Sequence, residues 1–345
     1  MGSAFSIFPF LKTKAHALLS FSPSEQQVKS MVTARSLDEI RSILTSTFAG
    51  ESSKLLIEEK NPLFKFETDL RKSFSKMLKS MVNISSGSMG NVLESFEMML
   101  TGYNLKRVFK SIILNQDKKL VLSSLVGTSY HSLDQLEALL QFERPDILLD
   151  YVPNHQLRSS LSSVINESIS DHEKIFKIDN EIDKFVYLEQ YKVDQDVSNE
   201  IDFVNILITC RTIDLNFPPS SHLISVSSHL TNMLERASGF RSSDEVLNFL
   251  SNNSLHFESF IKKAFSEDPK HPLRHFDVSY RRYLLKKDRA FFATNFSDDR
   301  TIIKFLNMRW TEISDIVRIA VGKANDIDPN IISESLITYH RYIQR

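Results

Sequence analysis

Apolar residues recur at steps of three and four positions along most of the chain. One such series consists of Val92, Leu93, Phe96, Met99 and Leu100. A second consists of Ile182, Phe185, Val186, Leu188 and Tyr191. This spacing places the apolar side chains on one side of an α-helix, whereas the strict alternation of a half-buried strand is rare in this chain. The pattern therefore predicts an all-α protein with long helices over both stretches.

Start and break signals divide this helical pattern into segments. Helix starts are expected at Ser22-Pro-Ser-Glu25, Ser36-Leu-Asp-Glu39 and Ser243-Asp-Glu245, where a hydroxyl accepts free backbone N–H groups and early acidic residues suit the helix dipole. Turn-forming residues predict breaks at 83–90, 115–119, 215–221 and 268–272. The second and third breaks predict domains at 1–119, 120–219 and 220–345.

Three asparagines stand in similar apolar segments at nearly equal separations along the chain. Asn104, Asn205 and Asn307 lie 101 and 102 residues apart, each with an apolar residue four before, one before and one after it. This period matches a small domain rather than a solenoid repeat of about 30 to 45 residues. We therefore expect three related helical domains in a pseudo-three-fold arrangement, with chance similarity as the alternative. Each asparagine is expected to be buried and to bond backbone groups where helices meet.

A second pair of segments supports the repeat. The segments 36–44 and 242–250 share a serine, an Asp-Glu pair and several apolar positions, and Asp38 and Asp244 are 206 residues apart. This separation is about twice the asparagine period. A degenerate middle copy is expected at 143–149, which reads Glu-Arg-Pro-Asp-Ile-Leu-Leu.

Composition excludes several classes of protein. The 42 Lys and Arg residues against 43 Asp and Glu residues give a net charge of −1, so the chain carries no overall signature of nucleic-acid binding. The single Cys210 excludes an internal disulfide and a cysteine-rich metal site. The apolar N-terminal stretch 4–11 lacks a basic leader, so it is expected to remain on the mature chain. Gly2 formally fits the myristoylation pattern, which requires a eukaryotic transferase.

Candidate chemistry is weak. The Gly-Ser-Met-Gly stretch 87–90 has backbone amides that suit an anion, but such stretches more often cap or connect helices. His271 and His275 have the i, i+4 spacing of metal ligands, yet Pro272 lies between them. The basic run 280–289 suits RNA, anionic lipid or a protein partner, or simply the solvated back of a core helix. We therefore predict no catalytic residue, no cofactor and no metal.

Two of the asparagine segments carry a wider motif. The segment 200–211 reads Glu-Ile-Asp-Phe-Val-Asn-Ile-Leu-Ile-Thr-Cys-Arg and ends at Arg211, and the segment 305–313 reads Phe-Leu-Asn-Met-Arg-Trp-Thr-Glu-Ile and contains Trp310. Three further segments follow the same order and spacing: 34–40, 84–106 and 174–187. Together they resemble the family of central-stalk proteins of archaeal-type and vacuolar-type (A/V-type) rotary ATPases.

The resemblance implies both an architecture and a function. It implies three related helical domains in a funnel-like body, with Asn104, Asn205, Arg211, Asn307 and Trp310 as structural motif residues. It also implies a non-catalytic subunit on the cytoplasmic face of a membrane, without a cofactor and without a nucleic-acid partner. Its partners would be the membrane rotor-ring (proteolipid) subunits and the central-shaft subunits, so that ion translocation is linked to ATP synthesis or hydrolysis. The choice of proton or sodium belongs to the ring.

The sequence also departs from the family pattern. The small Gly-Lys pair after the asparagine helix is present only as Gly322-Lys323, and the N-terminal aromatic-Ala-Arg pattern is missing. Two other interpretations therefore stay open. The first is an all-helical adaptor or scaffold of another assembly. The second is an enzyme with an unrecognised site, which a hydrogen-bonded histidine–carboxylate pair in a concave pocket would favour.

Overall fold

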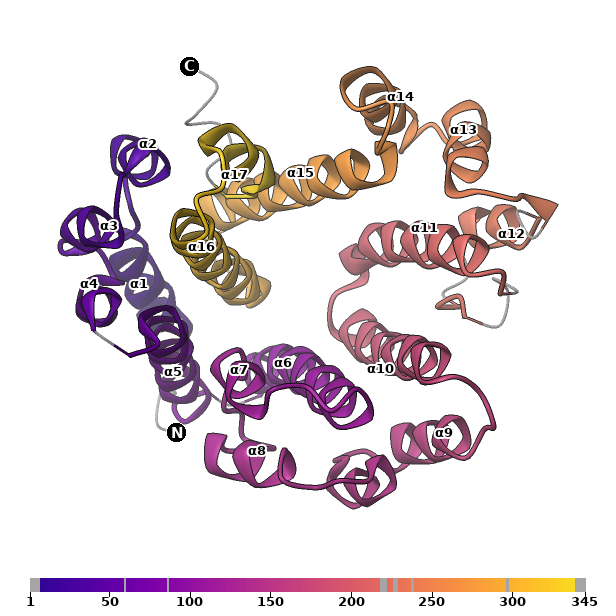
Figure 1. The fold of residues 1–345 in the computed structure, drawn as a ribbon, viewed down its shortest axis with the longest axis horizontal. Coiled ribbons are helices and arrows are strands. Elements are labelled where there is room, and N and C mark those ends of the chain that lie inside the picture. Colours follow the sequence, from indigo (N-terminus) through magenta and orange to yellow (C-terminus); the bar gives the residue numbers. More distant parts are fainter. Residues whose placement is uncertain are drawn as a thin grey trace, which may run out of the picture. The chain divides into compact units, whose positions relative to one another are not determined.

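Every regular element that the structure describes is a helix. The computed structural model describes residues 7–58, 60–85, 87–217, 222–225, 229–236, 239–295 and 298–338. These ranges contain α-helices and short 3-10 helices but no strand, which confirms the all-α prediction (Figure 1). The two expected long helices are present as α6 (Ser88–Ile113) and α10 (Asp171–Val193).

The helices group into two compact units. Unit 1 combines residues 1–111, 115–141 and 285–345, and unit 2 combines residues 112–114 and 142–284. The division into three domains at 1–119, 120–219 and 220–345, and their pseudo-three-fold arrangement, stays a prediction.

Unit 1 contains α6 together with α1 (Ile7–Leu19), α2 (Glu25–Thr33), α3 (Leu37–Leu44), α4 (Gly50–Ser53), η1 (Lys54–Ile57), α5 (Pro62–Val82), α7 (Lys118–Ser123), α8 (Leu133–Leu139), α16 (Arg300–Ala324) and α17 (Pro329–Ser335). Unit 2 contains α10 together with η2 (Pro145–Tyr151), α9 (His155–Ile165), η3 (Gln195–Val197), α11 (Ser198–Asp214), α12 (His229–Arg236), α13 (Ser243–Asn253) and α14 (Glu258–Glu267). The division falls within two helices: residues 112–113 at the end of α6 belong to unit 2, and the chain passes from unit 2 to unit 1 within α15 (Pro272–Thr294).

Serine side chains determine where several of these helices begin. Ser24 Oγ accepts a hydrogen bond from Gln27 N, and Gln27 Oε1 accepts one from Ser24 N, which forms a capping box before α2. Ser36 caps α3 and Ser242 caps α13 in the same hydroxyl-to-backbone manner. The three expected helix starts are therefore found within one residue of their predicted places.

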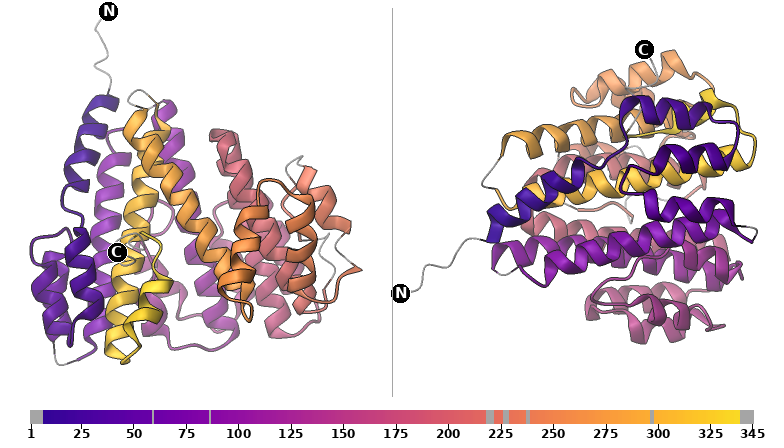
Figure 2. Two further views of the ribbon diagram at one scale, coloured as in Figure 1. Left: turned by 90° about the horizontal axis from the view of Figure 1, so that it is seen from above. Right: turned by 90° about the vertical axis from the view of Figure 1, so that its left-hand side faces the viewer.

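Unit 1 is organised around α16. This helix packs against α5 and α1 and also contacts α3 (Figures 1 and 2). Its apolar side includes Ile302, Phe305 and Ile316, which are all fully buried. Burial of each such side chain contributes about 1.5 to 3 kcal/mol to folding. At the end of α16, Gly322 admits Ile332 of α17, because a Cβ on Gly322 would lie only 2.7 Å from Ile332 Cδ1.

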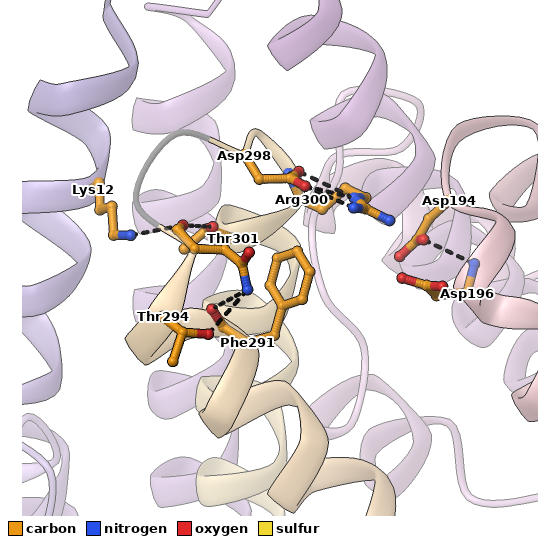
Figure 3. A network of polar contacts seen from close by, with 9 residues as sticks. Lys12, Asp194, Asp196, Phe291, Thr294, Asp298, Arg300 and Thr301 are labelled. Atoms are coloured by element: carbon orange, nitrogen blue, oxygen red, sulfur yellow. Dashed lines mark hydrogen bonds and ion pairs between the residues drawn. The ribbon is translucent and has the colours of Figure 1, made fainter.

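The connection between α15 and α16 is tied to the N-terminal helix. Lys12 Nζ of α1 donates a hydrogen bond to the Asn295 carbonyl oxygen at 2.8 Å, and Thr301 Oγ1 donates to the same oxygen at 2.7 Å (Figure 3). Arg300 Nη2 donates to Asp298 Oδ2 at 2.7 Å within the same connection. The first and last long helices of unit 1 are therefore joined by a polar contact as well as by apolar packing.

Unit 2 is a series of helices around an aromatic core. Helix α10 packs against α9 and α11, and α11 also packs against α13 (Figure 1). Phe203 of α11 stacks on Tyr280 of α15 with ring centroids 4.6 Å apart. The ring centroids of Phe257 and Tyr280 lie 5.0 Å apart, and both rings are fully buried. The basic run 280–289 therefore begins with a residue of the core. This agrees with the interpretation of the run as a helix that is buried on one side and carries its basic residues on the solvent side.

Candidate functional site

Asn104 lies in the middle of α6 and is fully buried. Its Oδ1 accepts a hydrogen bond from Val126 N at 3.0 Å, and its Nδ2 donates to Val126 O at 2.6 Å. One amide group thus satisfies both backbone groups of a residue in the connection between α7 and α8. A buried backbone group without a partner destabilises the fold by about 1 to 3 kcal/mol, so Asn104 holds this connection against its helix.

Asn205 makes the same pair of bonds in unit 2. It is fully buried in α11; its Oδ1 accepts from Ile224 N at 2.8 Å and its Nδ2 donates to Ile224 O at 3.0 Å. Ile224 follows Asn205 by 19 residues, and Val126 follows Asn104 by 22 residues. We use the term backbone clamp for such a residue: a buried Asn or Asp of a long helix that bonds the main chain of the segment following that helix.

The third backbone clamp is Asp315 of α16. This side chain is fully buried, and its Oδ2 accepts hydrogen bonds from Ile337 N at 3.0 Å and from Thr338 N at 2.6 Å. Ile337 follows Asp315 by 22 residues, the separation that also relates Val126 to Asn104. The contacts therefore make Asp315 the counterpart of Asn104 in the last long helix.

The expectation that Asn307 bonds backbone groups in the same way is wrong. Asn307 is only half-buried, and its Nδ2 donates to the carboxylate of Asp288 at 3.3 Å. It precedes Asp315 by eight residues, about 12 Å along the axis of α16, and it contacts Asp288 of α15 instead of the segment that follows α16. The similar apolar neighbours of Asn307 reflect burial of the helix and not the clamp position.

An arginine three residues after the clamp supports it at both places in unit 1. Arg107 Nη1 donates to Ser124 Oγ at 2.9 Å. Arg318 Nη1 donates to Ser335 O at 3.0 Å and to Asp315 Oδ1 at 2.7 Å. Burial raises the pKa of Asp315, although Arg318 and the backbone N–H groups act in the opposite direction. Each arginine thus bonds the residue two positions before the clamped one.

Replacing Asp315 by asparagine is expected to destabilise the fold by about 1 kcal/mol. The amide oxygen can still accept from Ile337 N and Thr338 N, whereas the amide nitrogen cannot accept from Arg318 Nη1. Asp315→Leu removes these possibilities and is expected to destabilise the fold by about 2 to 3 kcal/mol. Equilibrium denaturation in urea measures both variants, and equal losses for the two would contradict the clamp role.

The wild type and Asp315→Asn also carry an expected pH dependence. Because the pKa of Asp315 is raised in the folded state, its contribution to stability is fully present below the carboxyl's unfolded pKa and is lost as pH rises through the folded pKa. The amide of the variant does not titrate. The wild type should therefore lose stability relative to Asp315→Asn as the pH rises above about 4, the unfolded pKa of an aspartate, and a difference that does not change with pH would contradict the assignment.

Trp310 and Arg211, the other two motif residues, lie in different surroundings. Trp310 is half-buried and contacts Phe74 and Tyr103, with ring centroids 5.4 and 5.3 Å away. The Arg71 guanidinium carbon lies 4.7 Å from the centroid of its ring system. Arg211 is exposed in the last turn of α11, where a cation interacts favourably with the negative end of the helix dipole.

The short helices that follow a serine cap form a second set of three. Ser132 caps α8 through a capping box, and the segments 36–44, 132–140 and 242–250 all have Asp two residues after the serine and Glu or Gln three residues after it. The residues four and eight positions after each serine are buried: Ile40, Leu44, Leu136, Leu140, Val246 and Leu250. The middle copy is therefore at 132–140. The expected place, 143–149, lies largely in the 3-10 helix η2 instead.

A buried ion pair in α16 joins two residues of the segment 305–313 for which the sequence predicted no role of their own. Arg309 Nη1 lies 3.0 Å from Glu312 Oε2, and both side chains are almost completely buried. Arg309 Nη2 also donates to Leu18 O at 2.6 Å, and Ser22 Oγ donates to Glu312 Oε2 at 3.0 Å. The guanidinium carbon of Arg309 lies 3.9 Å from the ring centroid of Phe48. The pair thus joins α16 to the N-terminal segment of unit 1.

The candidate reactive groups do not form a recognisable active site. Burial raises the pKa of the Cys210 thiol, which disfavours the nucleophilic thiolate. His275 Nε2 lies 2.6 Å from Glu267 Oε2, but Lys263 also pairs with this half-exposed carboxylate at 3.5 Å. Such an arrangement is typical of surface ion pairs. Among the described residues, no group of three His, Cys, Asp or Glu side chains is placed to hold a metal ion.

Comparison with known proteins identifies the family. The family model for the ATP synthase (C/AC39) subunit matches residues 12–335, which include every helix described above except the first five residues of α1. No curated protein matches the chain. No helix within the described ranges combines the length and the apolar character needed to cross a membrane. The match extends over nearly the whole sequence, and the chain therefore belongs to the ATP synthase (C/AC39) subunit family of A- and V-type ATPases.

Proposed function

We propose that this chain is the non-catalytic central-stalk subunit of a rotary ATPase, where it couples the membrane rotor ring to the central shaft. The observation that carries this proposal is the family match over residues 12–335. Because the match spans both units, it concerns the whole helical body and not one small inserted domain. The partners we propose are the proteolipid subunits of the ring and the subunits of the shaft, at the cytoplasmic face of the membrane.

The internal contacts suit a part that transmits torque. Such a part must resist deformation, and a helix resists deformation best when its neighbours and connections are fixed to it. Asn104, Asn205 and Asp315 each fix a connecting segment to a long helix through buried hydrogen bonds. The buried Arg309–Glu312 pair adds a polar contact between α16 and the N-terminal segment. These contacts favour a stiff coupling element and require no reactive centre.

Purification of the tagged chain from gently solubilised membranes tests the proposal. We expect mass spectrometry to identify the proteolipid ring subunit together with shaft and ATP-binding head subunits. Recovery of soluble partners alone would favour the helical adaptor instead. Loss of the chain is also expected to reduce ATP-driven ion transport in isolated vesicles. If transport and its coupling to ATP hydrolysis stay unchanged after loss of the chain, the proposed function is rejected.

A further inference from the structure

Three helices of unit 1 bring two aromatic rings and two guanidinium groups together. Trp310 of α16 and Tyr103 of α6 meet edge to face, with ring centroids 5.3 Å apart and planes at 88°. The guanidinium carbon of Arg71 from α5 lies 4.7 Å from the Trp310 centroid, and that of Arg107 from α6 lies 4.5 Å from the Tyr103 centroid. We call these four residues the aromatic–arginine face.

The members of this face differ in exposure. Arg71 is buried, and its Nε and Nη2 both donate to Glu67 Oε1, at 2.9 and 2.7 Å. Arg71 Nη1 has no hydrogen-bond acceptor among the described residues, and the cation–π contact with Trp310 adds to the ion pair with Glu67 in stabilising the buried charge. By contrast, Tyr103 and Trp310 are half-buried and Arg107 is exposed. The outer part of the face is therefore open to a partner while its inner part is fixed.

The charge of the face indicates the kind of partner. Its two guanidinium groups and the Glu67 carboxylate that pairs with Arg71 together carry one net positive charge. Arg107 uses Nη1 to bond Ser124 Oγ, and a guanidinium group carries five N–H donors in all, so a second acceptor can still bind its planar fork. Tyr, Trp and Arg are also the residue types that are enriched at the centres of protein interfaces, and Arg107 is the exposed member of this face.

We propose that the aromatic–arginine face is a docking surface for a carboxylate-bearing segment of another protein in the ATPase complex. The carboxylate pairs with Arg107, and the apolar part of the same segment covers the rings of Tyr103 and Trp310. This inference rests on the proposed function for the identity of the complex. It goes beyond that function by assigning the contact residues and the acidic character of the partner segment.

Photo-crosslinking in the assembled complex tests the contact directly. Replacement of Tyr103 by p-benzoylphenylalanine keeps an aromatic ring at the face, and the same replacement at Leu120, an exposed residue of α7, serves as the control. After irradiation of the membrane complex, we expect position 103 to yield an adduct with an acidic segment of a different subunit. Adducts confined to this chain, or to a segment without acidic residues, would overturn the proposal.

Charge reversal tests the role of Arg107 independently. The variant Arg107→Glu is co-expressed with a differently tagged wild-type chain. The ratio of variant to wild type is measured in the purified complex and divided by the ratio of variant to wild type in the lysate. We expect this quotient to fall about tenfold or more, as for a residue at an interface centre. Lys76→Glu, which reverses an exposed charge of α5, should leave it close to one. Equal quotients for the two variants would overturn the proposal. Thermal unfolding of both variants checks that each of them folds.

The two proposals fail in different ways. If the wild type is recovered with the ring and shaft subunits but position 103 gives no adduct with another subunit, the docking proposal fails and the coupling function stands. If the wild type is recovered without any ATPase subunit, the coupling function fails, and the docking proposal fails with it as stated.

Discussion

Replacing Arg309 by methionine is expected to lower the free energy of unfolding by about 3 to 5 kcal/mol. The substitution leaves the Glu312 carboxylate buried in α16 without its cationic partner, which in the wild type lies 3.0 Å away. It also removes the hydrogen bond from Arg309 Nη2 to Leu18 O and the contact with the ring of Phe48. Equilibrium unfolding in guanidinium chloride, followed by far-UV circular dichroism, measures the loss.

The size of this loss is expected to depend on pH. Burial already raises the pKa of Glu312 in the wild type, and Arg309 is the largest opposing influence. Without Arg309 this pKa should rise further, so the variant's additional destabilisation appears as pH rises above the carboxyl's unfolded pKa. The loss should therefore be greater at about pH 7 than at about pH 4. A loss that is the same at both values would show that the charge of Glu312 is not responsible.

A double variant provides the control for this ion pair. Arg309→Met combined with Glu312→Leu removes both charges and replaces them with apolar groups of similar volume. Such replacements of a whole buried pair are often close to neutral. We therefore expect the double variant to be more stable than Arg309→Met alone. If the stability loss of the double variant equals the sum of the losses of Arg309→Met and Glu312→Leu measured singly, the two residues act separately and the ion pair is not the reason for the effect.

Replacing Asn205 by leucine is expected to destabilise unit 2 by about 2 to 3 kcal/mol. The substitution leaves both the N–H and the C=O group of Ile224 without the partner that the clamp supplies. The effect should be local at first, because the two bonds hold one connecting segment. Hydrogen exchange measured by mass spectrometry should therefore show faster exchange in the peptide that contains the Ile224 amide, together with a lower midpoint of denaturation.

Asn252→Leu is the matched control for the Asn205 variant. Asn252 is exposed in α13, and its Nδ2 donates to an acceptor within its own helix, the Asn248 carbonyl oxygen at 3.0 Å. This control is expected to change stability by less than about 0.5 kcal/mol. Comparable losses for Asn205→Leu and Asn252→Leu would mean that an asparagine-to-leucine change is harmful for a reason other than the clamp.

Periodicity along the chain was sufficient to predict the helical class and the long helices α6 and α10. Both predictions depend on interactions between near neighbours, since a spacing of three and four residues places apolar groups on one side of a helix. Serine caps are equally local, and they predicted the starts of α2, α3 and α13. The start of α8 was missed, although Ser132-Leu-Asp-Gln135 has the same capping-box pattern and could have been predicted in the same way.

The third clamp was missed for a different reason. Asn307 has the apolar neighbours of Asn104 and Asn205, but any residue on the buried side of a long helix has similar neighbours. What distinguishes a clamp is its partner in the following segment, and the Leu-Ile pair at 336–337 repeats the Leu-Val pair at 125–126 and the Leu-Ile pair at 223–224. Counting 22 residues back from Ile337 leads to Asp315. The separation of 19 residues found for Asn205 leads instead to Arg318, which cannot accept a hydrogen bond from a backbone N–H group. A comparison of the connecting segments would therefore have favoured Asp315.

By itself, the sequence determined the all-α class, the starts of α2, α3 and α13, two of the three clamp residues and the resemblance to the C/AC39 family. These features arise from patterns within one helix or from motifs in a constant order. Only the tertiary structure revealed the Arg309–Glu312 pair with Leu18 and Ser22, the clamp at Asp315 and the aromatic–arginine face. Each of these depends on which helices pack together, and the energies that select such packing come from contacts between residues far apart in the chain, which no local pattern records.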